Sequence, residues 1–376
     1  MSKIVFVMQD RAIGGGTSSL SSLYNNIKED YDIEIFQLTK YGSAKVSYSN
    51  VIKTSSWFCD SYYCSFADHK RFRSIITLIV KVLAKIFPSI INIYVRTFEK
   101  SYAGAKCVIA FGEGAAADFV GRIRTLKKFT WIHYDISYYP PNNRDLQLYL
   151  KFDKIVCVSH KIADSMRKMY PSLQERIVGI HNLVDHKRVY ELSSVPVPIE
   201  DEYMFDTPFT IVSIGRLCMV KRFSAIPKIA KELKDANIKF RWIIIGPPSD
   251  SIEQQRLYDS LSKFDVEDCV VWIGPKENPY PYLARANMLV STSSTEACPM
   301  IFIESKILNV PIVSTDILTA DEFILDGVDG VIVPLNQMSK MIINLLTNPN
   351  KLSILKNNAF ESAYNMTSIE AFRKLI

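Results

Sequence analysis

Two acidic side chains near the start of a predicted helix are the first candidates for chemistry in this sequence. Glu296 and Glu304 lie in the stretch SSTEACPMIFIE, with seven residues between them, and Pro299 can open the helix that carries Glu304. The first amides of that helix, including those of Met300 and Ile301, lack partners within the helix and can hold a phosphate. The pattern favours a phosphate-bearing ligand, although carboxylates at this spacing also occur by chance on a surface.

Basic side chains follow the strand that we predict over residues 209–214. That strand runs into Gly215-Arg216-Leu217, and Lys221 and Arg222 come five and six residues after Arg216. Cations at the carboxyl edge of a parallel sheet point into the ligand crevice, where they could neutralise a diphosphate without a metal ion. The alternative interpretation is a loop of solvated charges.

A glycine run after the first predicted strand offers a third candidate site. Gly14, Gly15 and Gly16, followed by Thr17, would let backbone amides approach an anion at the start of a helix. The run is not a dinucleotide fingerprint, because Ser19 stands where a third glycine is needed, and no Gly-Lys-Ser/Thr follows as in a P-loop. A simple tight turn remains the alternative.

Alternating strands and helices must position these residues in the first half of the chain. Leu20, Leu23, Tyr24 and Ile27 recur at helical spacing after the glycine run. Strands are expected at 3–8, 31–37, 106–111, 128–133, 153–159 and 177–181, and a helix at 160–170. The alternation predicts a parallel sheet with helices on both faces.

The same pattern restarts after an irregular segment. Residues 186–208 are rich in proline, charge and small polar side chains, which predicts an interdomain linker. Further strands are expected at 209–214, 240–246, 269–274, 287–292 and 310–315, with helices at 225–235, 251–263, 280–286 and 300–308. We therefore expect an α/β protein of two Rossmann-like, doubly wound domains: residues 1–190, with a C-terminal helix at 362–376 packing back on them, and residues 205–361. An interdomain cleft between the carboxyl ends of the two sheets would hold the ligand.

These motifs, taken in order, resemble the retaining family-4 (group 1) glycosyltransferases of GT-B fold. The resemblance covers essentially the whole chain and is strongest over 209–334, where STEACPMIFIESKILNVPIVST and DGVDGVIVP look like the donor-binding core of that family. It implies transfer of a sugar from a nucleotide donor, with retention of configuration at the anomeric carbon. The resemblance favours UDP, although no residue in the sequence decides the nucleotide.

The resemblance also implies roles for particular residues. Arg216 and Lys221 would bind the donor diphosphate and stabilise the leaving group, Glu304 would accept hydrogen bonds from the ribose, and Glu296 would contact the sugar hydroxyls. The domain of residues 1–190 would contribute His133 beside the donor sugar. The remaining substrate-binding residues would be Gly15, Gly16, Thr17, Lys276, Met300 and Ile301.

The chemistry of glycosyl transfer agrees with these roles. Cleavage of the glycosidic phosphate bond leaves negative charge on the diphosphate, which Arg216, Lys221 and the helix start at residue 300 could absorb. No isolated Asp-x-Asp motif appears in a suitable loop, so we expect no metal and no cofactor other than the donor itself. Retention without an evident nucleophile predicts front-face attack.

This sequence departs from the family pattern at two places. Ala297-Cys298 stands where Gly-Phe is usual in the family. Asn309 replaces a common glycine at a helix end, where asparagine tolerates a left-handed conformation.

Composition limits the classes of protein to consider. The 376 residues carry 45 basic and 39 acidic side chains, and the net charge of +6 is too small for a dedicated nucleic-acid binder. Seven cysteines without paired metal-site spacing favour a reducing, cytoplasmic compartment, and the opening MSKIVFVMQD is typical of a strand rather than a leader peptide.

One segment raises the question of a membrane. Residues 75–95 are apolar and long enough to span a bilayer, but they contain Lys81, Lys85 and Pro88. With its basic flanks, the segment 69–100 could lie on the inner face of a plasma membrane and meet its anionic surface; a buried helix pair is the alternative.

We thus expect a retaining hexosyltransferase that acts on a glycan or lipid-linked acceptor, in bacterial surface polysaccharide biosynthesis by analogy with the family. Two other functions use the same features. A sugar-nucleotide epimerase of GT-B fold would need no acceptor, and a non-catalytic nucleotide-sugar binding subunit would bind without turnover.

Overall fold

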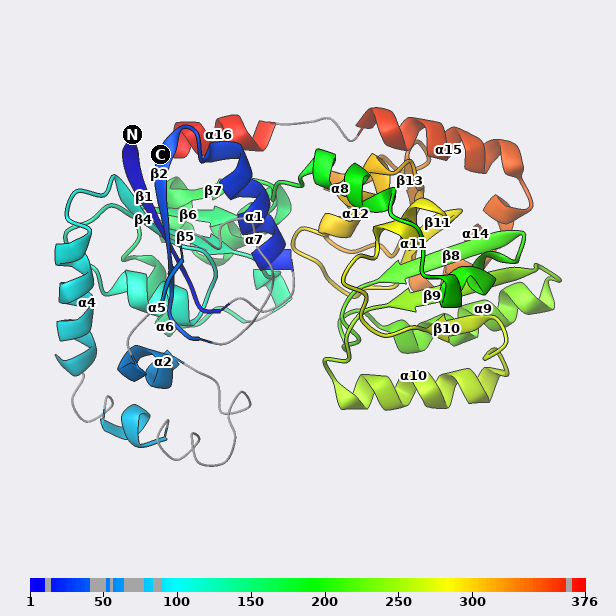
Figure 1. Cartoon of the computed structure of the whole chain (residues 1–376), viewed down its shortest axis with the longest axis horizontal. Coiled ribbons are helices and arrows are strands. Elements are labelled where there is room, and N and C mark those ends of the chain that lie inside the picture. Colours follow the sequence, from blue (N-terminus) through cyan, green and yellow to red (C-terminus); the bar gives the residue numbers. More distant parts are fainter. Residues whose placement is uncertain are drawn as a thin grey trace. The chain divides into compact units, whose positions relative to one another are not determined.

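Two α/β units make up the described structure. The computed structural model describes residues 1–10, 15–40, 52–54, 57–63, 78–83, 89–138, 140–362 and 367–376. Unit 1 comprises Met1–Val184 together with Met366–Ile376, and unit 2 comprises Asp185–Asn365. Each unit is built around one parallel sheet flanked by helices (Figure 1).

The sheet of unit 1 is parallel throughout. Its strands, in the order in which they pair, are β3 (Ile52–Thr54), β2 (Tyr31–Gln37), β1 (Ser2–Met8), β4 (Cys107–Ala110), β5 (Lys128–Ile132), β6 (Lys154–Cys157) and β7 (Ile177–Gly179). The central strands are continuous apolar runs because helices cover both faces of a parallel sheet. Ile4, Val5, Phe6 and Val7 of β1, for example, are all fully buried.

Helices from both ends of the sequence cover this sheet. They are α1 (Gly15–Ile27), α2 (Trp57–Tyr63), α4 (Ser89–Ser101), α5 (Ala115–Gly121), α6 (Asn143–Tyr149), α7 (His160–Met169) and α16 (Thr367–Leu375). In α16, Phe372 is buried against Phe6 and Trp131, and Arg373 pairs with Asp30 at 2.7 Å. The C-terminal helix therefore completes the core of unit 1.

Unit 2 has the strand order of a Rossmann fold. Its strands pair in the order β10 (Val270–Trp272), β9 (Phe240–Ile245), β8 (Phe209–Ile214), β11 (Met288–Ser291), β12 (Ile312–Ser314) and β13 (Gly330–Ile332). Its helices are α8 (His186–Ser193), α9 (Ile226–Asp235), α10 (Ser251–Phe264), α11 (Tyr280–Ala284), α12 (Met300–Ile307), α13 (Ala320–Phe323), α14 (Met338–Leu346) and α15 (Pro349–Ser362). The chain reverses direction along the sheet between β8 and β11, which is where folds of this type bind ligands.

The prediction of two Rossmann-like parallel-sheet domains is confirmed. The interpretation of residues 186–208 as an irregular linker is wrong. Asp185 caps α8 by accepting a 3.0 Å hydrogen bond from the amide of Arg188, and α8 packs on α11 and α12 within unit 2. Sequence periodicity missed this element because it buries only Val189 within an otherwise polar helix.

Parts of three sequence predictions lie outside the described residues. These are Gly14 of the glycine run, residues 69–77 and 84–88 of the basic apolar segment, and residues 363–366 of the predicted C-terminal helix. Among the residues that are described, no helix combines the length and the apolar character needed to cross a bilayer.

A buried ion pair fixes α12 to the end of the unit 2 sheet. Lys306 Nζ lies 2.7 Å from Asp329 Oδ2, and the Asp329 side chain is fully buried. The other Asp329 oxygen accepts a 2.9 Å hydrogen bond from the Leu325 amide. Both charges are satisfied in this arrangement, so removal of one partner leaves the other buried and uncompensated.

We therefore expect Lys306→Met to lower the free energy of unfolding by about 3 kcal/mol or more in urea titrations. The matched control is Lys231→Ala, which breaks the exposed Lys231–Asp235 pair on α9 and should cost less than about 1 kcal/mol. Equal effects of the two variants would contradict this account of the buried pair.

Candidate functional site

The carboxyl edge of the unit 2 sheet is formed by loops in unusually close contact. A Cβ atom on Gly246, at the end of β9, would lie 1.7 Å from the carbonyl oxygen of Gly215 at the end of β8. Only glycine permits this approach. The two loops are also joined by a 2.9 Å hydrogen bond from the Leu217 amide to the Pro247 carbonyl. Glycine at position 215 also leaves room for the Lys221 side chain, because a Cβ atom on residue 215 would lie only 2.9 Å from Lys221 Cε.

Lys221 and Glu296 meet at the point where the sheet changes direction. The Lys221 ammonium forms an ion pair with Glu296 Oε1, and that oxygen also accepts a 2.7 Å hydrogen bond from Ser293 Oγ. Both side chains are about one-fifth exposed. Lys221 follows β8 and Glu296 follows β11, so the fold brings together a cation and a carboxylate 75 residues apart. The pair is accessible to a ligand but is not dispersed in solvent.

The two arginines near Lys221 have different environments. Arg222 donates to the carbonyls of Thr292 at 2.8 Å and Ser293 at 2.6 Å, so it ties the β8 loop to the β11 loop rather than facing a ligand. Arg216 is exposed, and no hydrogen bond or ion pair joins its side chain to another described residue. Of the two, Arg216 is the one whose guanidinium is available to an anion.

Glu304 lies on α12 and is held by a residue that the sequence analysis did not identify. The Tyr280 hydroxyl, on α11, donates to Glu304 Oε1 at 3.1 Å. Burial raises the pKa of Glu304 to about 7, and the tyrosine hydrogen bond opposes that rise. The Glu304 carboxyl therefore changes charge near neutral pH.

The other residues predicted in unit 2 lie at the start of α12 and after β10. Met300 and Ile301 are the first two residues of α12, whose first turn has no side-chain cap. Lys276 is engaged within the unit, because its ammonium lies 2.6 Å from Asp201 Oδ2, which also accepts from Tyr282. The ion pair with Asp201 limits the reach of Lys276 toward a ligand.

His133 in unit 1 is held as a neutral imidazole at the end of β5. Its Nε2 is buried and has no partner among the described residues, and burial lowers the pKa of His133 to about 4. The Glu113 carboxylate accepts hydrogen bonds from the backbone amides of His133 and Tyr134, and burial raises the pKa of Glu113. A buried ring nitrogen without a hydrogen bond is unfavourable, so a ligand that supplied one would be stabilised there.

Gly15, Gly16 and Thr17 form the first turn of α1. The two glycines are exposed, and a Cβ on Gly16 would meet no described atom within 4 Å. The described residues therefore do not crowd the backbone at Gly16.

The structure thus brings some predicted residues together within each unit. Lys221 and Glu296 are in contact, whereas Glu304 contacts Tyr280. Tyr280 and Glu113 escaped the sequence analysis; the only signal for Glu113 is a carboxylate between two glycines, directly after the apolar run CVIAF. No group of three or more histidine, cysteine or acidic side chains in the described part of the chain could hold a metal ion.

Part of the chain is similar in sequence to a known family of proteins. Residues 199–362 match the family described as glycosyl transferases group 1. An uncharacterized glycosyltransferase of Methanocaldococcus jannaschii is 25% identical over 173 residues, or 46% of this chain. The N-acetylgalactosamine-N,N'-diacetylbacillosaminyl-diphospho-undecaprenol 4-alpha-N-acetylgalactosaminyltransferase of Campylobacter jejuni is 22% identical over 232 residues, or 61% of this chain. The matches span about half the length of these relatives, 42% and 58% respectively.

Solved structures extend the likeness to the whole chain. Anabaena HepE, crystallised with UDP, superposes with a TM-score of 0.74 at 13% identity, covering 99% of this chain and 98% of HepE. An identity this low is evidence for the fold alone. The chain has the GT-B fold, and its residues 199–362 carry the sequence pattern of group 1 glycosyltransferases.

Proposed function

We propose that this protein is a retaining glycosyltransferase that moves a hexose from a UDP-sugar to a glycan or lipid-linked acceptor. The contact that carries the proposal is the Lys221–Glu296 pair at the switch point of unit 2. The match over residues 199–362 and the UDP bound by HepE support the reaction class and the nucleotide.

When the donor binds, Lys221 would interact with its diphosphate and Glu296 with its sugar. Lys221 and the exposed Arg216 supply positive charge for the diphosphate, and the uncapped start of α12 supplies the amides of Met300 and Ile301. Glu296 would then accept hydrogen bonds from sugar hydroxyls. Negative charge grows on the diphosphate as the glycosidic bond breaks, so these groups stabilise the transition state more than the bound donor.

His133, Gly15, Gly16, Thr17 and Lys276 complete the proposed set. The neutral His133 imidazole can donate or accept a hydrogen bond at the sugar without adding a charge. The glycines and Thr17 offer an open helix start for the acceptor or the phosphates. Lys276 would act near the base while it remains paired with Asp201. No metal ion takes part in this scheme.

We propose bacterial surface polysaccharide assembly at the inner face of the membrane as the context. The Campylobacter relative, whose name specifies a diphospho-undecaprenol acceptor, supports a lipid-linked substrate. Outward-facing apolar side chains in the segment 69–100 support an encounter with an anionic membrane: Ile79 is 52% exposed and Ile93, on α4, is 62% exposed.

The role of Lys221 predicts a loss of affinity that depends on phosphate. Lys221→Ala should weaken UDP binding about tenfold or more in calorimetric titrations, because one charge-assisted contact is lost. Uridine, which lacks phosphate, should bind both forms equally. Lys228→Ala, on the exposed face of α9, is the control and should leave both affinities unchanged. Equal losses for UDP and uridine would instead indicate damage to the fold.

The raised pKa of Glu304 predicts that UDP binding strengthens with pH. Ribose hydroxyls donate to a carboxylate, and the ionised fraction of a group with a pKa of about 7 rises from about one-tenth at pH 6 to about nine-tenths at pH 8. Wild-type affinity should therefore rise up to about tenfold over this range relative to Glu304→Gln. Titration of the UDP phosphate is common to both proteins and cancels in their ratio. A ratio that does not change with pH would exclude Glu304 from the ribose contact.

Glu296 should be needed for transfer more than for nucleotide binding. We expect Glu296→Gln to lower kcat at least about a hundredfold with lipid-linked and soluble acceptors, while UDP affinity changes less than about threefold. The anomeric proton coupling in the wild-type product should match that of the donor, and EDTA should leave the rate unchanged. An inverted product, or full turnover by Glu296→Gln, would refute the mechanism.

A further inference from the structure

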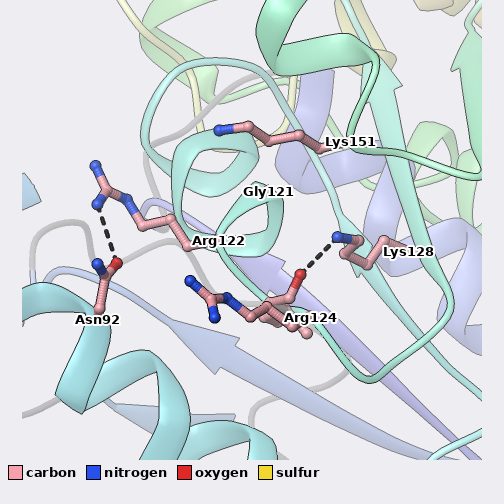
Figure 2. Close-up of a pocket in the computed structure, with 7 residues that line it drawn as sticks. Asn92, Gly121, Arg122, Arg124, Lys128 and Lys151 are labelled. Atoms are coloured by element: carbon pink, nitrogen blue, oxygen red, sulfur yellow. Dashed lines mark hydrogen bonds between the residues drawn. The ribbon is translucent and has the colours of Figure 1, made fainter.

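Unit 1 contains a basic pocket that the transfer reaction does not use. Its volume is about 530 Å³, and four of its seven lining residues are cationic. These are Arg122, Arg124, Lys128 and Lys151; Asn92, Gly121 and Ile123 complete the lining. Figure 2 shows the side chains of Arg122, Arg124 and Lys151 extending toward the same side, beside Asn92 of α4.

Acidic neighbours neutralise only part of this charge. Arg122 pairs with Asp118, with Nε 3.0 Å from Oδ2, and also donates to Asn92 Oδ1 at 3.4 Å. The Glu99 carboxylate accepts hydrogen bonds from the backbone amides of Arg124 and Thr125.

Lys128 also lines this pocket, and its ammonium is held by a hydrogen bond within unit 1. Its ammonium donates to the Ile123 carbonyl at 2.5 Å, while its backbone amide donates to Asp153. Burial lowers the pKa of Lys128, and the negative charges of Asp153 and Glu99 oppose this decrease. Among the described residues, the side chains of Arg124 and Lys151 have no hydrogen-bond or ion-pair partner, and both residues are exposed. Two of the positive charges that line the pocket thus have no acidic partner in the described part of the chain.

The pocket lies at the opposite edge of the sheet from the candidate site in unit 1. Lys128 is the first residue of β5, whereas His133 follows its last residue, and a five-residue strand spans about 13 Å. Lys151 likewise precedes β6, and Arg122 and Arg124 lie in the turn that enters β5. A ligand here would not be the donor sugar beside His133.

We infer that this pocket binds a phosphate group. The planar guanidinium of Arg124 and the ammonium of Lys151, neither of them paired with a described side chain, suit a tetrahedral anion that accepts several hydrogen bonds. The Asn92 amide adds a polar contact from α4. The phosphate could belong to a soluble phosphorylated compound or to a lipid headgroup. The outer face of α4, where Ile93 is exposed together with Arg96 and Lys100, adjoins Asn92 and would suit a lipid surface.

The soluble source is tested with pyrophosphate as the probe. The variant Arg124→Glu/Lys151→Glu reverses the two unpaired charges, and Lys28→Glu/Lys168→Glu makes the same change in net charge at exposed lysines of unit 1. We expect the pocket variant to bind pyrophosphate at least about tenfold more weakly than wild type at low salt, in calorimetric titrations. The control should lose less than about twofold. The titrations are fitted with two sites, because pyrophosphate binding in unit 2 would be common to all three proteins, and the comparison uses only the affinity that differs between them.

The lipid source is tested by sedimentation with vesicles of phosphatidylcholine alone or mixed with phosphatidic acid. If the phosphate is a headgroup, wild type should sediment with the mixed vesicles, and the pocket variant should lose at least about fivefold more of this binding than the control. UDP titration checks that each variant keeps a working unit 2, and circular dichroism checks the fold.

If the pocket variant loses pyrophosphate binding but keeps vesicle binding, the ligand is a soluble phosphate compound. If it loses vesicle binding, with or without loss of pyrophosphate binding, the ligand is a headgroup. If the pocket variant and the control behave alike in both assays, the pocket is not a phosphate site, whatever the outcome for glycosyl transfer.

Discussion

The candidate site in unit 2 depends on how closely its parallel strands can bring their ends together. The loops after β8 and β9 touch through two glycines, and Arg222 binds the β8 loop to the carbonyls that follow β11. Lys221 is thereby held against Glu296 across the switch point. A mobile loop would leave the same cation in water, where its attraction to an anion is weak. The rigid backbone keeps both charges partly shielded from water, and this strengthens their attraction to a charged ligand.

The sequence was sufficient to predict the architecture because buried parallel strands are short apolar runs. FTIVSI, FRWIIIG and NMLVST are recognisable without any tertiary information. The placement of Arg216, Lys221 and Glu296 at strand ends followed from those runs, since polar residues after such strands share one edge. Strand β3 was not predicted because its three residues include the polar Lys53 and Thr54 and so form no apolar run, and β13 was also missed.

Tertiary partners could not be predicted in the same way. Nothing in the local sequence indicates that Tyr280 reaches Glu304, or that Asp201 takes up the charge of Lys276, because the partners are 24 and 75 residues apart. Glu113 was missed for a related reason: its contacts are backbone amides of another strand end. Asn309 shows the converse, since its left-handed backbone, with φ of 57°, follows from its residue type and place after a helix.

The packing of α16 on unit 1 affects the order in which the protein can be built on the ribosome. Unit 2 is encoded by one uninterrupted stretch and can fold as soon as that stretch emerges. Unit 1, although encoded first, lacks Phe372 beside Phe6 until translation reaches residues 367–376. Unit 1 therefore lacks this part of its core while the whole of unit 2, Asp185–Asn365, is synthesised. We therefore expect unit 1, although it precedes unit 2 in the sequence, to complete its core after unit 2 has folded.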